Sequence, residues 1–269
     1  MTVRIPKALG TILIILATIA ITLAQAHPSE SSQDAVAPEG SVESSCARSD
    51  VPCLVVPRCE SGRYALVNRF YLTKVPAGTY ADPADQTEVR VCYNATGFRI
   101  RHVVYDKHVF SPFTKCNDNV WEKGDVLETF IAPVHSIYDV PKFYWEVDGS
   151  PNSNLFVALI ENANMGNTTC RSCKPGPLPC QGAHDFPPHK FSYKARVYKN
   201  AQKPMWTTDL FIPFTIFPES MRKSKLWRGN FYRYDYPQGE TGPYQLSGWS
   251  PTFNGSFHIP TRFGVITLE

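Results

Sequence analysis

The 269-residue chain carries 27 lysines and arginines against 24 acidic residues, a formal net charge of +3, and 43% of its residues are hydrophobic. Without Arg4 and Lys7, which lie in an expected leader, 25 basic residues face 24 acidic ones, a net charge of +1. A surface so close to neutral does not attract nucleic acid or an anionic membrane, so neither partner is expected. The apolar content is ample for a core and excludes wholesale disorder.

The first 26 residues have the pattern of a secretory signal peptide. Arg4 and Lys7 give the positive start, residues 8–24 form the apolar run, and Ala24-Gln25-Ala26 fits the cleavage rule. We therefore predict a secreted, extracellular protein that begins at His27 and has no membrane segment after cleavage. An uncleaved anchor helix is the alternative, because the apolar run is near the lower limit of spanning length.

Residues 27–60 are predicted to be a flexible, cysteine-containing lead-in to a folded domain over residues 61–269. From His27 to about Ser45 the chain has hardly a bulky apolar side chain, so it cannot bury enough surface to offset the entropy of ordering. The stretch from Cys46 to Cys59 holds three cysteines and is a candidate for a disulfide to the main body.

The cysteines are interpreted as disulfide partners, because an even number in a secreted chain favours that state. A zinc or thioredoxin-like site at Cys170 and Cys173 is disfavoured, since no second pair with zinc spacing follows and no βαβ pattern surrounds them. The pairing stays open. The eight candidates are Cys46, Cys53, Cys59, Cys92, Cys116, Cys170, Cys173 and Cys180. Three sequons predict a glycoprotein modified at Asn94, Asn167 and Asn254.

Two predicted hairpins open the folded domain. Residues 88–93 and 97–105 alternate with the period of half-buried strands, and Asn94 to Gly97 between them suits a turn. Residues 126–131 and 143–147 form the second pair.

Later elements follow the same short-strand pattern. Strands are predicted over 191–198, 205–212, 226–234 and 264–268, and a short helical turn over 218–225. Residues 165–188, with three cysteines and five prolines, are predicted to be a disulfide-braced loop inserted between strands. Many short strands punctuated by 23 prolines predict an all-β fold, an antiparallel β-sandwich of jelly-roll or immunoglobulin-like type.

Three sequence blocks stand out in the second half of the chain. The first is Val-Trp-Glu-Lys-Gly-Asp-Val-Leu-Glu-Thr-Phe over residues 120–130, and the second is Phe-Tyr-Trp-Glu-Val over 143–147 with Ser-Pro-Asn over 150–152. The third joins Trp-Arg-Gly-Asn-Phe-Tyr-Arg over 227–233 to Trp-Ser-Pro over 249–251 and the segment 257–264. In this order, and over about residues 65–269, they resemble the family 9 carbohydrate-binding modules and their DOMON-related relatives.

The resemblance implies a non-catalytic β-sandwich that binds oligosaccharides or polysaccharide ends beside polysaccharide-degrading enzymes. Such a site holds a sugar between two aromatic rings, because the C–H face of a pyranose stacks on a ring while its hydroxyls need polar partners. Carried over to this chain, the rings are Trp121 and Phe257. Glu128 is the carboxylate that accepts hydrogen bonds from sugar hydroxyls, and Asn254 is a further polar partner.

Three departures from the family pattern favour an alternative, a scaffold for adhesion or protein interaction that has lost sugar binding. Phe257 replaces a tryptophan, Glu146 stands where an arginine is expected, and a glycan on Asn254 would obstruct the pocket. Trp121 and Phe257 could equally be core residues, and Glu128 a structural carboxylate. Trp145, Trp227 and Trp249 are predicted to be structural.

No catalytic residue is predicted, because the chain has no recognisable hydrolase motif, nucleophile elbow or metal triad. Asp125 and Glu128 could form a glycosidase acid pair or ligate calcium. Relatives of the resembled family often hold calcium, so structural calcium stays open, although no cofactor is required. A heme-binding electron-transfer domain is a further alternative, with Met205 and one of His102, His108 or His258 as ligands.

Overall fold

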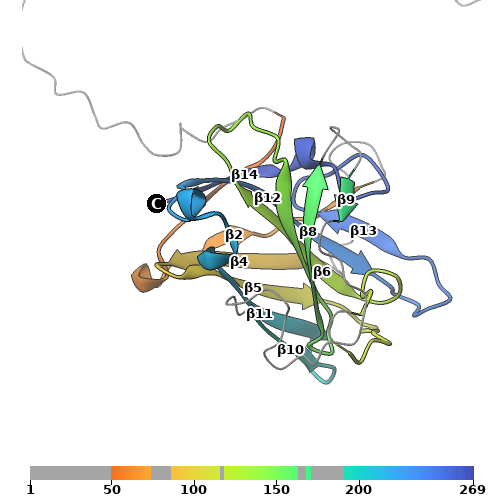
Figure 1. The fold of residues 1–269 in the computed structure, drawn as a ribbon. Coiled ribbons are helices and arrows are strands. Elements are labelled where there is room, and N and C mark those ends of the chain that lie inside the picture. Colours follow the sequence, from red (N-terminus) through yellow and green to blue (C-terminus); the bar gives the residue numbers. More distant parts are fainter. Residues whose placement is uncertain (1–49, 74–85, 116–117, 163–167, 171–190) are drawn as a thin grey trace, which may run out of the picture. The chain divides into compact units, whose positions relative to one another are not determined.

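Fourteen strands in two sheets make up the described part of the chain (Figure 1). The computed structural model describes residues 50–73, 86–115, 118–162, 168–170 and 191–269. The predicted signal peptide, most of the lead-in and Asn167 lie outside these residues. The strands are β1 (Cys53–Val56), β2 (Ala65–Val67), β3 (Tyr71–Leu72), β4 (Thr87–Asn94), β5 (Gly97–Tyr105), β6 (Val126–Pro133), β7 (Phe143–Gly149), β8 (Leu155–Asn162), β9 (Thr168–Cys170), β10 (Ser192–Tyr198), β11 (Met205–Pro213), β12 (Leu226–Asp235), β13 (Gln245–Gly248) and β14 (Gly264–Leu268).

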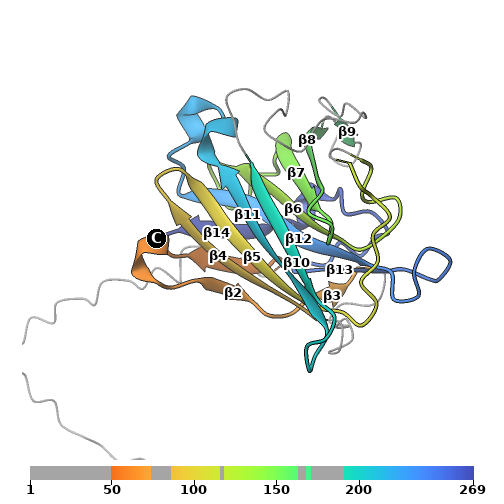
Figure 2. The same ribbon diagram turned by 90° about the horizontal axis from the view of Figure 1, so that it is seen from below.

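The two sheets form a sandwich. The nine-stranded sheet runs β1-β14-β12-β6-β7-β8-β9, and β13 pairs with both β12 and β3. The five-stranded sheet runs β10-β11-β5-β4-β2, and Figure 2 shows its strands side by side. Apolar side chains from both sheets share one core, among them Val91 and Phe98 from the smaller sheet and Ile131 and Trp227 from the larger. The predicted all-β sandwich is confirmed.

The register confirms both predicted hairpins. Asn94 pairs with Gly97 at the β4–β5 turn, and β6 pairs antiparallel with β7. One pairing departs from the antiparallel prediction, because β1 lies parallel to β14. This strand falls inside the predicted flexible lead-in, where the apolar run Cys53–Val56 is too short to show periodicity.

The remaining predicted elements are found in place, with one exception. Strands β10, β11, β12 and β14 match the predicted ranges within one residue, and the helical turn over 218–225 contains the 3₁₀ segment η5 (Glu219–Met221). The predicted loop over 165–188 was wrong in part, because it contains β9, which pairs with β8. Three further 3₁₀ segments are η2 (Cys59–Ser61), η4 (Phe214–Ile216) and η6 (Pro260–Arg262). Among the described residues no helix is long and apolar enough to cross a membrane.

The two sheets differ in how their outer faces are covered. In β5, buried and more exposed side chains alternate along most of the strand, so its outer face is open to solvent. In β6, seven successive residues are buried, and in β12 only two of ten are not. A second apolar cluster explains this, because Val120, Phe257 and Phe263 from loops pack on Phe130 and Tyr144 from the sheet. The outer face of the nine-stranded sheet is therefore an interior surface.

The tryptophans predicted to be structural are confirmed as such. Trp227 is fully buried, and its ring packs between Phe98, at 5.0 Å between centroids, and Phe217, at 4.8 Å. Trp145 and Trp249 are 6% and 7% exposed.

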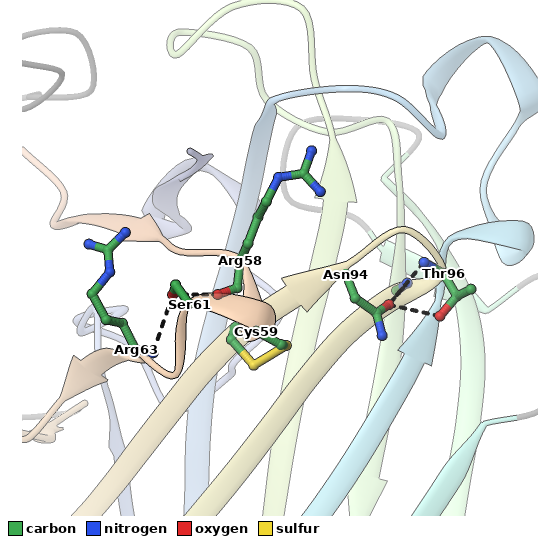
Figure 3. Close-up of a disulfide and its surroundings, with 8 residues drawn as sticks. Arg58, Cys59, Ser61, Arg63, Asn94 and Thr96 are labelled. Atoms are coloured by element: carbon green, nitrogen blue, oxygen red, sulfur yellow. Dashed lines mark hydrogen bonds between the residues drawn. A yellow bond between two sulfur atoms is a disulfide. The ribbon is translucent and has the colours of Figure 1, made fainter.

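A disulfide joins η2 to β4 through Cys59 and Cys92, whose Cα atoms are 5.0 Å apart (Figure 3). It pins the end of the predicted lead-in to the five-stranded sheet, as the cysteine pattern suggested. Cys53 is disulfide-bonded as well. Cys46, Cys116, Cys173 and Cys180 lie outside the described residues, as does the side chain of Cys170.

Candidate functional site

Three carboxylates meet on the outer face of the nine-stranded sheet, beneath the loops that carry Trp121 and Phe257. Glu128 on β6 pairs across the sheet with Asp148 on β7, and Glu146 lies two residues before Asp148 on the same face. Their oxygens offer ligand atoms that all lie within 4.8 Å of one another. Glu128 is 2% exposed, Asp148 0% and Glu146 6%. We call Glu128, Glu146 and Asp148 the outer trio.

Little neutralises the outer trio. Among the described residues, the basic side chain within ion-pair distance of it is His258, with Nε2 3.8 Å from a Glu146 oxygen. Burial lowers the pKa of His258 to about 4, so this imidazole is neutral near pH 7 and brings no positive charge. Neither oxygen of Asp148 receives a hydrogen bond from an N–H or hydroxyl group of the described residues. Asp148 can instead share a proton with the Glu146 carboxyl group.

Protons hold the outer trio together in the absence of a ligand. Burial raises the pKa of Glu146 to about 8. Burial, followed by the negative charge of its neighbours, also raises the pKa of Glu128 and Asp148 well above their usual values. Three like charges this close cannot all ionise in a dry site, because desolvation and mutual repulsion both favour the neutral form. A ligand that donates hydrogen bonds or carries positive charge would relieve this.

Tyrosine hydroxyls surround the outer trio. Burial raises the pKa of Tyr144, Tyr232 and Tyr234, and the negative charge of nearby carboxylates raises it further, with Glu128 contributing at all three. The Tyr144 hydroxyl lies 2.7 Å from Nδ1 of His258, which fixes the imidazole against the sheet. The site thus combines acid groups, phenols and one histidine.

Trp121 lies over this face but is partly covered. Its ring packs edge-on against Phe156 of β8, with centroids 4.4 Å apart and planes at 64°. The loop beneath it is anchored, since the Asp125 amide donates to the Phe110 carbonyl and the Asn119 side chain to Glu122. The exposed part of the indole is available to a ligand.

Phe257 is the predicted site residue that the structure places furthest from its expected role. It is 3% exposed and stacks on Tyr232, with centroids 4.1 Å apart and planes at 8°. The Phe257 ring packs inside the second apolar cluster. Phe257 is therefore a core residue, which was the alternative interpretation of the sequence. A phenylalanine finds an apolar partner here because Tyr232 points outward from β12 directly beneath the loop.

The sequons within the described residues are accessible. Asn254 is exposed, and its side-chain oxygen accepts a hydrogen bond from the Ser256 amide. At the β4–β5 turn, the Asn94 side-chain oxygen accepts from the amide and hydroxyl of Thr96 (Figure 3). Glycosylation at Asn94, Asn167 and Asn254 stays a prediction.

A second trio of carboxylates, formed by Asp106, Asp125 and Asp235, lies at the edge between the sheets and has its own cation. Arg233 lies 3.2 Å from Asp106 and 3.1 Å from Asp235, and it donates to the Tyr105 carbonyl. Asp125 accepts hydrogen bonds from the amides of Phe110 and Tyr236, although burial, followed by the negative charge of Asp106, raises its pKa to about 8. We call this group the inner trio. Unlike the outer trio, it has an arginine within ion-pair distance.

The outer trio fits a hard divalent cation better than the inner one does. Calcium takes oxygen ligands, and Glu128, Glu146 and Asp148 offer only carboxylate oxygens, with both oxygens of Asp148 lacking a donor. The inner trio has the same donor set, but Arg233 already occupies it. Asp125 and Glu128, paired by their spacing in the sequence, therefore fall into different clusters.

Sequence reasoning missed Asp148 and Tyr144, and it named His258 only as a candidate heme ligand. The first two share the outward face of β7 with Glu146, so period-2 alternation could have grouped them. Reading β7 as a half-buried strand hid the signal, because its outer face is covered. The contact with His258 comes from a loop more than a hundred residues away, which no local pattern reveals.

Comparisons with known proteins agree on the fold. No protein-family model matches the chain. A solved structure from Bacteroides uniformis, described as a candidate carbohydrate-binding protein, aligns with a TM-score of 0.54 at 16% identity, over 81% of this chain and 99% of that one. At this identity the likeness shows the fold alone, a β-sandwich shared with that protein.

Further similar proteins were found. A family 9 module from Caldicellulosiruptor kristjanssonii, solved with glucose and with cellotriose, gives TM-scores of 0.48 and 0.47 at 10% identity over 81% of this chain and 95% and 93% of those chains. A protein of Arthroderma benhamiae named "Extracellular protein" is 28% identical over 226 residues, which cover 83% of this chain and 93% of that protein.

Proposed function

We propose that this protein is a secreted, non-catalytic carbohydrate-binding protein whose site is the outer face of the nine-stranded sheet. The observation that carries the proposal is the outer trio, a set of buried carboxylate oxygens with too few donors. Sugar hydroxyls are hydrogen-bond donors, and a charged acceptor makes the stronger contact. The partly exposed Trp121 ring offers a stacking face at the same place.

Access to the outer trio requires the covering loops to move. Phe257 stacks on Tyr232 and lies over the sheet, so in this proposal it belongs to the cover and Trp121 supplies the stacking ring. Asn254 is exposed on the same loop and stands ready to contact a sugar at the rim. The names of the relatives support the extracellular setting and the ligand class.

Titration calorimetry with neutral oligosaccharides, such as cello- and xylo-oligosaccharides, tests the proposal. We expect Trp121→Ala to weaken binding about tenfold, which corresponds to about 1.4 kcal/mol. Glu128→Gln should weaken it further, since an amide replaces the carboxyl group that hydroxyl donors of a sugar would allow to ionise. The matched control is Tyr138→Ala, an exposed aromatic beyond the opposite end of β6. Absence of binding to any neutral or charged glycan contradicts the proposal.

A scaffold that has lost sugar binding is the second candidate, favoured by one observation. Phe257 and Glu128 are both buried, so the predicted clamp is closed. A Phe257→Ala variant that keeps its fold distinguishes the two, because it uncovers the face. If the uncovered protein binds no glycan, the scaffold role is favoured.

One structural observation favours a heme site. Met205 and His108 both line a cavity of about 590 Å³ at the end of β11, together with Lys107 and Lys199. These two side chains could supply axial ligands, whereas Nδ1 of His102 is engaged with Thr208 at 2.7 Å. Reconstitution with heme tests this directly, and a protein without a Soret band has no such site.

A further inference from the structure

The outward face of the five-stranded sheet carries an excess of positive charge. Side chains at every second position of its strands point away from the core. The basic ones are Arg90, Arg99, Arg101, Lys194 and Arg196, and the acidic ones are Glu88 and Asp209. Five minus two gives +3, equal to the formal net charge of the whole chain. Figure 2 shows the strands that bear this face.

The register places like charges directly opposite one another. Arg90 on β4 is paired with Arg101 on β5, and the same row continues through Asp209 on β11 to Lys194 on β10. Like charges at directly opposed positions destabilise an antiparallel pair. The ion pairs of Arg90 with Glu88, at 3.3 Å, and of Arg101 with Asp209 offset part of this cost, and a bound anion would offset more of it.

The ion pairs on this face leave its cations available. Arg101 and Arg196 share Asp209, at 3.9 and 3.3 Å, and the side chains of all three are about half exposed. Exposed ion pairs of this kind contribute little to folding stability, so the arginines can leave them to bind another anion. Among the described residues, no carboxylate lies within ion-pair distance of Arg99 or Lys194.

Aromatic side chains border these cations. The pairing of Ala65, Val91 and Ile100 across three strands places Tyr64 in the same row as Arg99, and Phe211 is paired with Arg99 on the other side. Tyr64 is 55% exposed, and the Arg99 guanidinium lies 5.5 Å from the Phe211 ring centre. These three residues line a cavity of about 230 Å³ with Arg101, Ser192 and Asp209.

We propose that this face binds a linear polysaccharide that bears carboxylates, that is, a polyuronate. The arginine fork matches a carboxylate with two parallel hydrogen bonds, and the flanking rings offer stacking faces to pyranose units. The row from Arg90 to Lys194 crosses four strands and spans about 14 Å, enough for several sugars. The site lies on the opposite sheet from the outer trio and does not rest on the proposed function.

The test uses the whole chain and polygalacturonate, with methyl-esterified polygalacturonate as the neutral counterpart. We expect binding to the free acid, little binding to the ester, and an affinity that falls as sodium chloride rises. The double variant Arg99→Gln/Arg101→Gln should lose about tenfold in affinity. Tyr64→Ala should lose less, through stacking alone.

A charge-matched control separates the site from general attraction. Lys123→Gln/Lys142→Gln removes two exposed charges next to β6 and β7 of the other sheet and should bind as the wild type does. Equal loss in both double variants, or unchanged binding in the arginine variant, overturns the proposal. So does equal affinity for single-stranded DNA, which would mark a general polyanion surface. Trp121→Ala should not affect polygalacturonate binding. If the five-stranded sheet proves not to bind polygalacturonate, the proposed neutral-sugar site on the opposite sheet is not contradicted.

Discussion

The inner and outer trios contain the same number of buried carboxylates and yet differ in what balances them. Arg233 lies against two members of the inner trio, and the backbone amides of Phe110 and Tyr236 satisfy the third. The outer trio faces a neutral histidine and keeps its protons. A buried acid cluster is structural when the protein supplies its own counter-charge, and it is open to a ligand when it does not.

The position of each trio explains the difference. The inner trio lies between the sheets, where β5 and β12 bring Asp106 and Arg233 together as part of folding. The outer trio lies beneath loops on the outer face of the nine-stranded sheet. The corresponding outer face of β5, in the other sheet, is exposed to solvent.

The largest effect is expected from Arg233→Met. Removing the cation leaves Asp106 and Asp235 buried without the positive charge of Arg233, and breaking a buried pair typically costs about 3–5 kcal/mol of folding stability. Urea unfolding at pH 7 measures it. Arg101→Gln, an exposed arginine, is the control and should change stability by less than about 0.5 kcal/mol. A small effect at Arg233 would show that its carboxylates are not charged in the folded protein.

Calcium should stabilise the protein through the outer trio alone. A cation that binds only the folded state adds about 2.7 kcal/mol at a hundred times its dissociation constant. We expect calcium to raise the melting temperature of the wild type and of Asp106→Asn, provided the latter folds. Asp148→Asn should abolish the rise. A rise that persists in Asp148→Asn would mean that calcium binds elsewhere. If calcium raises the melting temperature of no variant, the outer trio holds protons or sugar hydroxyls and not calcium.

The same substitution in the two trios should have opposite signs. Asp148→Asn removes a buried acid that, in the described part of the chain, accepts from no N–H or hydroxyl group, so without calcium it should be neutral or stabilising by about 1 kcal/mol. Asp106→Asn deprives Arg233 of a partner and should destabilise by about 2 kcal/mol. Both differences come from chemical denaturation with a chelator present. Equal effects would mean that the trios are equivalent.

Much of the fold followed from strand periodicity, while the site depended on what covers a face. Alternation along Gly97–Tyr105 predicted β5 because one of its faces is solvated. The same rule placed β7 but did not indicate that Tyr144, Glu146 and Asp148 are buried, since the covering loop around Phe257 is distant in sequence. The family resemblance pointed to Trp121 and Glu128, which lie on the same face of the nine-stranded sheet. It could not foresee that Phe257 would stack on Tyr232.

The smallest effect is expected from pH, through the outer trio, as a change in the free energy of unfolding per pH unit. The pKa of Glu146 is about 8 in the folded chain and near 4.5 when unfolded, so the folded state holds the extra proton between these values. Stability from this group is complete below about pH 4.5 and is lost as pH rises toward 8. Between pH 7 and 8, unfolding in chelator should show wild-type stability falling by about 1 kcal/mol more than that of Glu146→Gln, because Glu146 in the folded protein becomes about half ionised at pH 8. Asp125 titrates in the same direction in both proteins and cancels. Parallel pH profiles would mean that Glu146 is already ionised in the folded protein, and the outer trio would then need a counter-ion at neutral pH.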